Sequence, residues 1–340
     1  AEQNMPAVAL TDHGNLFGAI PFFREAKKAG IKPIIGNEMY VINGSLDDPN
    51  PPKKERRYHL VVLAKNAVGY RNLVKLTSIS HLRGMRGRGI FARACIDKQL
   101  LRQHSEGLIV ATACLGGEIP QAILRGRPEV AREVAAWYQE VFGDDFYLEI
   151  QDHGLADEEF VREGMVDLST STGIPLIATN DCHFHRREDT FAHRVLIGIG
   201  LNRDLEDLQR SYAYNAEFYI KSPQEMHELF KEFPGACERT AEIASRCNVR
   251  FDTDTLHLPK FAVPKKSCVT ERQRSHSGLI VVCFSRAMNG SGSSPSSSTA
   301  RRANKICTIE AFISKIPGPW ATPFSTNQGN VGSIRANQYL

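Results

Sequence analysis

Four short apolar segments each run directly into a side chain that can bind a metal ion, and this repetition constrains the fold most. The segments that begin at Ala7, Lys32, Leu108 and Ile174 lead, in order, to His13, to Glu38, to Cys114, and to Asp181 with His183. An apolar run that stops at polar residues or a glycine is typical of a buried strand followed by a turn. In parallel α/β folds, catalytic side chains collect at the carboxyl ends of the strands. The sequence therefore predicts one convergent site.

Helical spacing separates these segments, and the alternation predicts an α/β barrel or open sheet with parallel strands. The spacing predicts helices at residues 16–29, 69–82, 95–104, 128–142, 157–171, 188–199, 223–233 and 235–248. We interpret Lys32–Ile42 as a strand pair broken near Gly36, and expect a further strand at 59–65. Residues 83–93 are predicted to form a basic loop.

Composition excludes several classes of protein. The 340 residues are 42% hydrophobic and 24% charged, as in ordinary globular proteins, and no apolar run is long enough to cross a membrane. The eight cysteines are scattered with no CxxC pair, which favours reduced thiols and a cytoplasmic location. No secretory signal is visible, and because the chain begins at Ala1 we expect its natural N-terminus to lie upstream.

The positive charge is concentrated in the last part of the chain. Residues 266–340 hold nine Lys/Arg and two Glu, a net +7, so the total of +4 leaves −3 for residues 1–265. Bulk charge therefore gives no argument for nucleic-acid binding by the globular part. Residues 265–340 are rich in Ser, Gly and Arg, and two interpretations stay open: translation in a wrong reading frame, or a disordered tail.

Six side chains form the candidate metal site: His13, Glu38, His59, Cys114, Asp181 and His183. Imidazole and thiolate suit zinc, and carboxylates suit zinc or manganese and can bridge two ions. Such ions can activate water and neutralise a leaving oxygen at a phosphodiester. The arginines at 83, 86, 88 and 93 would then supply positive charge to phosphate.

Each residue also has a plainer interpretation. His13 can be a turn residue and Glu38 a surface acid, while Cys114 can be a small buried hydrophobe. His59 is weak because it begins its strand. Asp181 and His183 give the strongest signal, since they lie two residues apart directly after a buried strand, with Cys182 expected to face away.

The remaining histidines and motifs add little. His153 follows a strand and is expected to approach the same mouth and contact substrate. His81, His104, His185 and His193 are given no role. No phosphate-binding loop, nucleophile elbow or HExxH helix is present.

With these residues in view, the chain resembles the N-terminal part of the alpha subunit of bacterial DNA polymerase III. The likeness rests on residues 9–15, 30–36, 59–65, 69–73, 112–120, 178–183 and 214–219, and it runs to about residue 264. It implies a PHP (polymerase and histidinol phosphatase) domain, a distorted seven-stranded α/β barrel with metal ions at one mouth. It divides the chain into a PHP domain (1–200), a helical extension (201–264) and a tail outside the family (265–340).

The resemblance also implies the ligands of three ions. Glu38 and Asp181 would share one ion. Glu38, His59 and Cys114 would hold a second, and His13 with His183 a third. Asp181 and His183 would be catalytic. The family opens with a His-x-His motif that this sequence does not contain, which leads us to expect weakened first and third ion sites.

Three functions follow from the resemblance. In the first, the chain is part of a replicative DNA polymerase whose PHP domain has metal-dependent 3′–5′ exonuclease activity. The second is a free-standing PHP phosphoesterase, and the third a scaffold for a proofreading subunit. The polymerase palm, which uses Mg²⁺, would lie beyond residue 264, so this chain alone is not expected to polymerise DNA. Implied partners are DNA, the proofreading subunit, the sliding clamp and the clamp loader, with no membrane.

Overall fold

A computed structural model describes residues 1–52, 54–209, 214–252 and 255. Residues 1–252 belong to one compact unit. The tail predicted at 265–340 lies outside the described residues. Within the described part, no helix is long and apolar enough to span a bilayer.

The core of this unit is a mixed sheet of eight strands among the described residues. Its strands are β1 (Ala7–Leu10), β2 (Lys32–Ile42), β3 (Tyr58–Ala64), β4 (Met85–Arg86), β5 (Arg93–Asp97), β6 (Leu108–Ala111), β7 (Phe146–Ile150) and β8 (Leu176–Ala178). The order is β4-β5-β2-β3-β6-β7-β8, with β1 also paired to β2. This architecture confirms the expected α/β class, with one strand more than the seven expected.

Strand β2 is continuous over eleven residues, so the predicted break near Gly36 is wrong. Its first half pairs with β1 and its last residues pair with β5, both in parallel and on the same edge. The opposite edge pairs with β3 in antiparallel fashion. Because both edges of β2 are occupied, the strand is buried along nearly its whole length and needs no turn at the glycine.

Strand β3 is the exception to the predicted parallel arrangement. It is antiparallel to β2 on one side and to β6 on the other, whereas β6, β7 and β8 are mutually parallel. No helix separates β2 from β3. The connection is the proline-containing loop of residues 43–57. Because parallel neighbours need a crossover connection, usually a helix, a loop of this kind lets the next strand run antiparallel.

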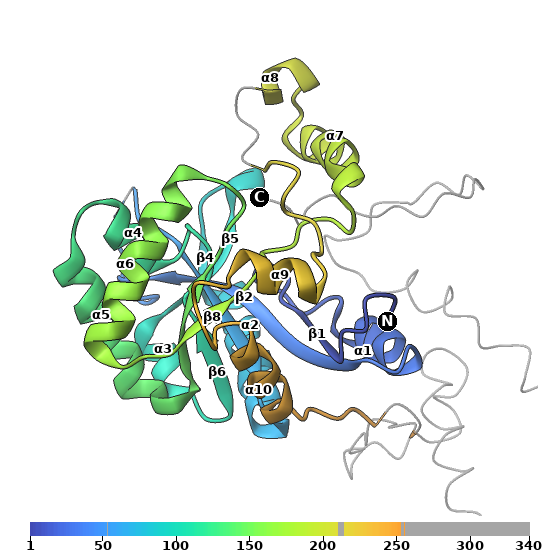
Figure 1. Cartoon of the computed structure of the whole chain (residues 1–340). Coiled ribbons are helices and arrows are strands. Elements are labelled where there is room, and N and C mark those ends of the chain that lie inside the picture. Colours follow the sequence, from blue (N-terminus) through green and yellow to red (C-terminus); the bar gives the residue numbers. More distant parts are fainter. Residues whose placement is uncertain (53, 210–213, 253–254, 256–340) are drawn as a thin grey trace, which may run out of the picture. The chain divides into compact units, whose positions relative to one another are not determined.

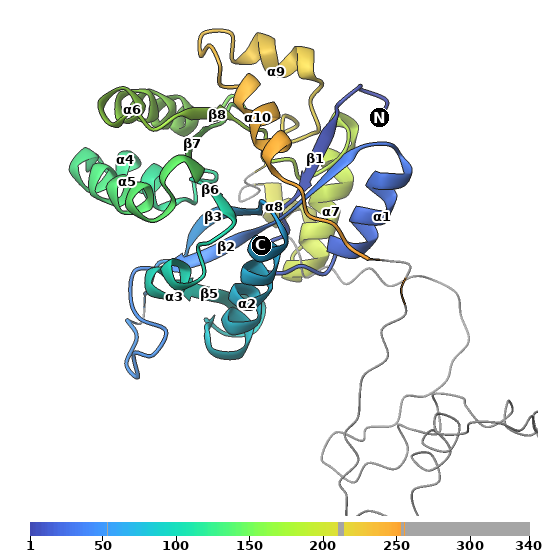
Figure 2. The ribbon, with the colours of Figure 1, turned by 90° about the horizontal axis from the view of Figure 1, so that it is seen from below.

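Most helices lie on the outer side of the strands, whereas α7 and α8 project away from them (Figures 1 and 2). The helices are α1 (Ala19–Lys28), α2 (Ala67–Arg83), α3 (Lys98–Gln103), α4 (Glu118–Leu124), α5 (Pro128–Phe142), α6 (Ala156–Thr172), α7 (Thr190–Leu201), α8 (Leu205–Gln209), α9 (Pro223–Leu229) and α10 (Glu238–Arg246). Short 3-10 turns lie at Gly89–Phe91, Gly143–Asp145 and Arg187–Asp189. The helix predicted at 95–104 begins only at Lys98, because Arg93–Asp97 is strand β5.

Helix α10 packs against both β8 and β1, and no pairing between these two strands closes the sheet within the described residues. Its Ile243 lies with Ile34, Ile109 and Ile177 in a small apolar cluster. A larger core fills the space between the sheet and helices α2 to α6. These two cores hold the strands in register. The candidate site lies near the ends of the strands.

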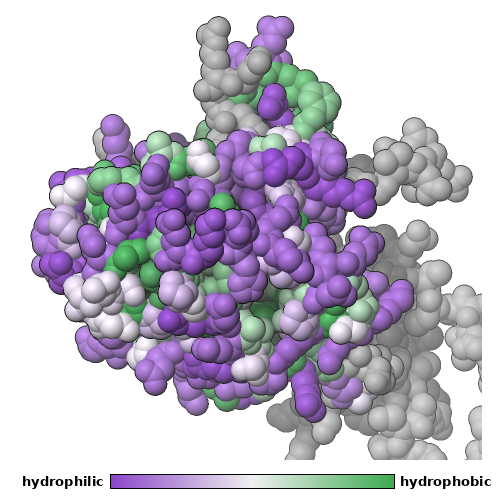
Figure 3. Space-filling view, in the orientation of Figure 1, coloured by the Kyte–Doolittle hydropathy of each residue, from purple (hydrophilic) through white to green (hydrophobic). Residues whose placement is uncertain are grey.

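The face of the molecule seen in Figure 3 is mainly hydrophilic, with apolar surface over the projecting α7–α8 segment. Helix α7 exposes Phe191 and Ile199, whose relative exposures are 64% and 68%. The five cysteines in the described residues are all free thiols, as the sequence predicts.

Candidate metal centre

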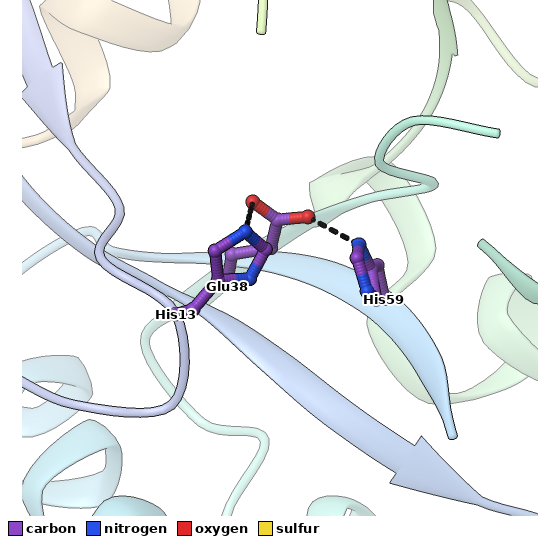
Figure 4. Close-up of side chains that lie close together, drawn as sticks. All are labelled: His13, Glu38 and His59. Atoms are coloured by element: carbon purple, nitrogen blue, oxygen red, sulfur yellow. Dashed lines mark ion pairs between the residues drawn. The ribbon is translucent and has the colours of Figure 1, made fainter. Parts of the chain in front are cut away.

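Three of the predicted side chains form a compact group. The ligand atoms of His13, Glu38 and His59 all lie within 4.8 Å of one another. Glu38 directs one carboxylate oxygen towards each imidazole: Oε1 is 2.8 Å from His59 Nδ1, and Oε2 is 3.6 Å from His13 Nε2 (Figure 4). A carboxylate placed in this way between two imidazoles can bridge metal ions.

The pairing of β2 explains why these three side chains meet. His13 follows β1 and forms an isolated parallel bridge with Glu38, next to where β1 leaves the edge of β2. On the other edge, antiparallel pairing puts His59 opposite Tyr40, two residues beyond Glu38 on the same face. Because β3 is antiparallel, its beginning lies where its parallel neighbours end. His59 can therefore be a candidate ligand even though it lies at the beginning of its strand.

Cys114 joins the group from the loop after β6. Its Sγ lies 3.3 Å from His59 Nδ1 and 3.8 Å from Glu38 Oε1. Gly116 makes this approach possible, because a Cβ there would lie 2.9 Å from the His59 ring. The thiol is thus part of the cluster and faces two other candidate ligands, which the interpretation as a simple buried hydrophobe does not require.

Asp181 and His183 come from the segment after β8. His183 Nε2 lies 3.4 Å from Asp181 Oδ1, and the His183 ring packs on Tyr214 with a centroid separation of 4.2 Å. The charge of Asp181 acts on the titration of His13, His59 and Cys114. Asp181 and His183 therefore lie within electrostatic reach of the other candidate ligands.

Cys182 takes no part in this cluster. Its Sγ lies 3.2 Å from Asn180 Nδ2 and points towards the Tyr219 carbonyl, as the expected alternation along the segment predicts. Sequence analysis missed two aromatic residues that build the pocket, Tyr40 and Tyr214. The Tyr40 ring lies 5.6 Å from that of His13 and 5.2 Å from that of His59. Its position two residues after Glu38 on a strand was the available signal.

Burial and neighbouring charges shift the titration of these groups. Burial lowers the pKa of His13 and outweighs the attraction of Glu38, which favours a neutral imidazole with a lone pair to donate. Burial opposes the charge on His59, but its hydrogen bond to Glu38 raises the pKa overall. Burial and the nearby carboxylates raise the pKa of Cys114 well above its usual range. Uptake of a cation by this thiol would release a proton.

The loops that carry two of the candidate ligands have unusual backbone conformations. Ala113, directly before Cys114, has φ of 60°, and Asp181 has φ of 38°. Residues other than glycine adopt such angles at a cost of about 1–3 kcal/mol, and such positions cluster at functional sites. The surrounding contacts must therefore hold both loops in place.

Two histidines support the pocket from behind. His153 is buried, with Nδ1 2.6 Å from Glu158 Oε1 and Nε2 2.8 Å from the Asn180 carbonyl, so it braces the Asp181 loop and does not contact the pocket as expected. His81, to which the sequence gave no role, lies with Nε2 2.8 Å from the carbonyl of Gly14, beside His13. Both rings are held by partners, which leaves them a structural role.

The predicted basic loop is only partly available to a substrate. Arg83 pairs with Asp47 and Arg86 with Glu55. Arg93 is different: it hydrogen-bonds to backbone carbonyls and forms no ion pair with a carboxylate of the described residues. Its guanidinium lies 5.7 Å from the Tyr40 ring centroid. Its charge also acts on His59. Of the four arginines, Arg93 is the one that the contacts place beside the pocket.

The donor set fits a metal ion. His13 Nδ1 is buried and has no hydrogen-bond partner among the described residues. An unpartnered polar atom in a buried position is costly unless a ligand satisfies it. The pocket brings together imidazole, carboxylate and thiol groups, the set that zinc prefers. His13, Glu38 and His59 form a possible three-residue metal site.

Comparison with known proteins places this geometry in a family. Residues 1–153 match the PHP domain. The chain is 49% identical over 250 residues to the DNA polymerase III subunit alpha of Borreliella burgdorferi, covering 72% of this chain and 21% of the relative. The corresponding subunits of Treponema pallidum (41% over 278 residues) and Thermus aquaticus (40% over 268 residues) cover 80% and 76% of the chain, and 23% and 22% of the relatives. The chain belongs to the DNA polymerase III alpha subunit family.

The PHP match ends at residue 153, whereas similarity to the alpha subunits extends over 250 residues or more. The chain spans about a fifth of the length of these curated relatives. PHP domains bind divalent metal ions, and the pocket lies at the strand ends of this domain.

Metal binding should stabilise the folded PHP domain. A ligand that binds only the folded state adds RT ln(1 + [L]/Kd), about 2.7 kcal/mol at a hundredfold excess over Kd. We expect Zn²⁺ or Mn²⁺ to raise the melting temperature of the wild type, and H13A or H59A to lose most of that rise. Substitution of the exposed His227 by alanine is the control. Equal metal-induced shifts in the wild type and H59A would contradict the assignment.

Proposed function

We propose that this chain is the PHP region of a replicative DNA polymerase alpha subunit and that it hydrolyses phosphodiester bonds at DNA 3′ ends with divalent metal ions. The observation that carries the proposal is that His13, Glu38, His59 and Cys114 lie together. The charges of Asp181 and His183 act on the same group, which supports their inclusion. Similarity to DNA polymerase alpha subunits supports DNA as the substrate class.

The proposed ligands are His13, Glu38, His59, Cys114, Asp181 and His183, and the proposed metal is zinc or manganese. Bound ions would supply an activated water and neutralise the leaving oxygen. Glu38 can serve two ions because its oxygens face different imidazoles. Asp181 and His183 are the proposed catalytic pair, since they follow the same strand and their side chains lie 3.4 Å apart.

Arg93 is the proposed contact for the substrate phosphate. Its charge is not neutralised by a carboxylate in any ion pair of the described residues, and it stands beside Tyr40 at the pocket. A guanidinium in this position offers paired N–H donors to phosphate oxygens.

The activity of the whole polymerase is also a proposal for this chain. In the proposed whole protein, residues 1–200 form the PHP domain and residues 201–264 form a helical extension towards the polymerase palm. Mg²⁺ bound in the palm would support DNA-templated synthesis. DNA, the proofreading subunit, the sliding clamp and the clamp loader are the proposed partners. A free-standing small-molecule phosphoesterase is disfavoured, because similarity to alpha subunits continues well past residue 153.

One observation favours a second function, that of a scaffold for a proofreading subunit. Helix α7 exposes Phe191 and Ile199, and Figure 3 shows apolar surface over this segment. Exposed apolar surface of this kind is typical of contacts with another protein. A scaffold would need the exposed helix but not the metal pocket.

A comparison of two substrates tests these functions. The purified chain is incubated with Mn²⁺ or Zn²⁺ and either a 3′-labelled oligonucleotide or histidinol phosphate. We expect release of labelled nucleotide and its loss when a chelator removes the metal. Phosphate release from the small ester alone would favour the free-standing phosphoesterase. Inactivity on both substrates, with a proofreading subunit retained by the wild type and lost in F191A, would favour the scaffold.

A further inference from the structure

We propose that Glu149, which lies outside the proposed ligand set, is a positioning residue that holds the Cys114 loop and the Asp181 loop in fixed relation to each other. The positioning is a property of the folded chain without metal. Its consequence for metal binding rests on the proposed function. Glu149 lies on β7, between β6 and β8, whose ends lead into these two loops.

Towards β6, Glu149 makes two hydrogen bonds to the residues just before Cys114. Its backbone N–H donates to Thr112 Oγ1 over 2.8 Å. Its carboxylate Oε2 accepts from the backbone N–H of Ala113. The second bond reaches the residue whose φ is 60°, so it acts where the backbone most needs an external constraint.

Towards β8, the same carboxylate interacts with the hydroxyl of Thr179, two residues before Asp181. Gln151 Nε2 donates to Thr179 Oγ1 over 3.2 Å. A threonine hydroxyl has one proton, so accepting from Gln151 leaves that proton for Glu149. One carboxylate therefore interacts with residues just before both Cys114 and Asp181.

The buried position of the Glu149 side chain means that its loss would not be compensated by water. The side chain of Glu149 is buried, with a relative exposure of 4%, and it lines a small, partly open pocket together with Cys114 and Gln151. An alanine at this position would leave the Ala113 N–H without its acceptor and enlarge this small pocket. A strained loop that loses such a bond is free to relax. Cys114 and Asp181 would then lose their common geometry.

Three variants separate positioning from other roles. E149A removes both bonds of the carboxylate. E149Q keeps an acceptor for Ala113 and can pair with the Thr179 hydroxyl through its amide. T179V removes only the link to the Asp181 loop, and it stands in for E149A if that variant does not fold. Glu163, which is exposed on α6, provides the matched control E163A.

Amide hydrogen exchange of the metal-free chain measures positioning directly. We expect E149A to accelerate exchange in residues 113–116 and 181–183 together by tenfold or more, and T179V to accelerate only the second segment. E149Q and E163A should stay close to the wild type. Unchanged exchange in both segments of E149A and in the second segment of T179V would overturn the proposal, whether or not the chain is a nuclease.

Cobalt binding measures the consequence at the pocket. Partners that orient metal ligands typically contribute 10–100-fold to affinity. We expect E149A to weaken Co²⁺ binding by that factor and to reduce the thiolate-to-cobalt charge-transfer absorption, and E149Q to restore both. Equal losses in E149Q and E149A would identify Glu149 as a ligand and overturn positioning. If the wild type binds no Co²⁺, the proposed function fails while the exchange experiment still decides the role of Glu149.

Discussion

Replacement of Asp181 by alanine should abolish the metal-dependent release of nucleotides from a DNA 3′ end. Asp181 lies 3.4 Å from His183, and its charge reaches three other candidate ligands. The hydrogen bond with His183 and the neighbouring imidazoles outweigh burial and lower the pKa of Asp181. The carboxylate is therefore negative at neutral pH, as a cation site requires. The alanine variant removes this charge.

The expected loss is large because two effects combine. Loss of a group that takes part in proton transfer costs about 10²–10⁴-fold in rate. Loss of a ligand also weakens metal binding, by more than the 10–100-fold that an indirect partner costs. H183A should act in the same way, because it removes the hydrogen-bond partner of Asp181.

The rate of nucleotide release from a 3′-labelled oligonucleotide, measured over a range of Mn²⁺ concentrations, tests this expectation. D167A on the exposed face of α6 is the control for the loss of an aspartate and should retain full activity. Circular dichroism of D181A confirms folding. Undiminished activity in both D181A and H183A would remove the proposed site.

Three of the candidate ligands could be predicted from sequence because each lies three residues beyond the end of an apolar strand. Local sequence specifies where an apolar strand stops, and the polar residue that follows is visible without any structure. His13, Cys114 and Asp181 were found in this way. Their convergence required only the rule that the ends of parallel strands gather at one edge.

His59 shows that this reasoning does not give the direction of a strand. Its strand runs antiparallel to both neighbours, which turns the beginning of β3 towards the pocket. Strand direction depends on pairing between residues far apart in the chain, and the apolar pattern of a buried strand is the same in either direction. His59 was among the candidate ligands, but its place at the start of a strand made it a weak one.

Glu149 and β5 were missed for related reasons. Glu149 lies inside its strand and is buried by neighbours that belong to distant segments, so nothing local distinguishes it from a surface acid. The apolar residues of β5 are few and run directly into helix α3, with Asp97 as both the last strand residue and the helix cap. An overlap of this kind hides the boundary, because one residue serves two elements.

Replacement of Gly69 by alanine should destabilise the domain by about 3 kcal/mol or more, because it would force two backbones apart. A Cβ on Gly69 would lie 1.8 Å from the carbonyl oxygen of Gly107, and a Cβ on Gly107 would lie 2.6 Å from the nitrogen of Gly69. The two glycines therefore let the first turn of α2 contact the turn before β6. Since the obstructing atoms belong to the backbone, no side-chain rotation relieves the clash.

The displacement should reach the pocket, because α2 also supports it. Asn66 caps the helix by accepting from the N–H groups of Val68 and Gly69 at 2.9 and 3.0 Å. Further along α2, Thr77 accepts a hydrogen bond from Asn37, the neighbour of Glu38. A shift of α2 would thus loosen the strand that carries Glu38. We expect metal affinity to fall together with stability.

Urea unfolding of G69A and of the control G126A separates a clash from backbone strain. Gly126 has φ of 65° but no atom near its missing Cβ, so alanine there meets strain alone, about 1 kcal/mol. Gly69 has an ordinary helical backbone, so alanine there meets the clash alone, and its helix propensity by itself would stabilise α2. A free energy of unfolding in G69A equal to or above that of the wild type would mean that α2 and the β6 turn are not in contact, and the support that α2 gives to Glu38 would have to come from elsewhere.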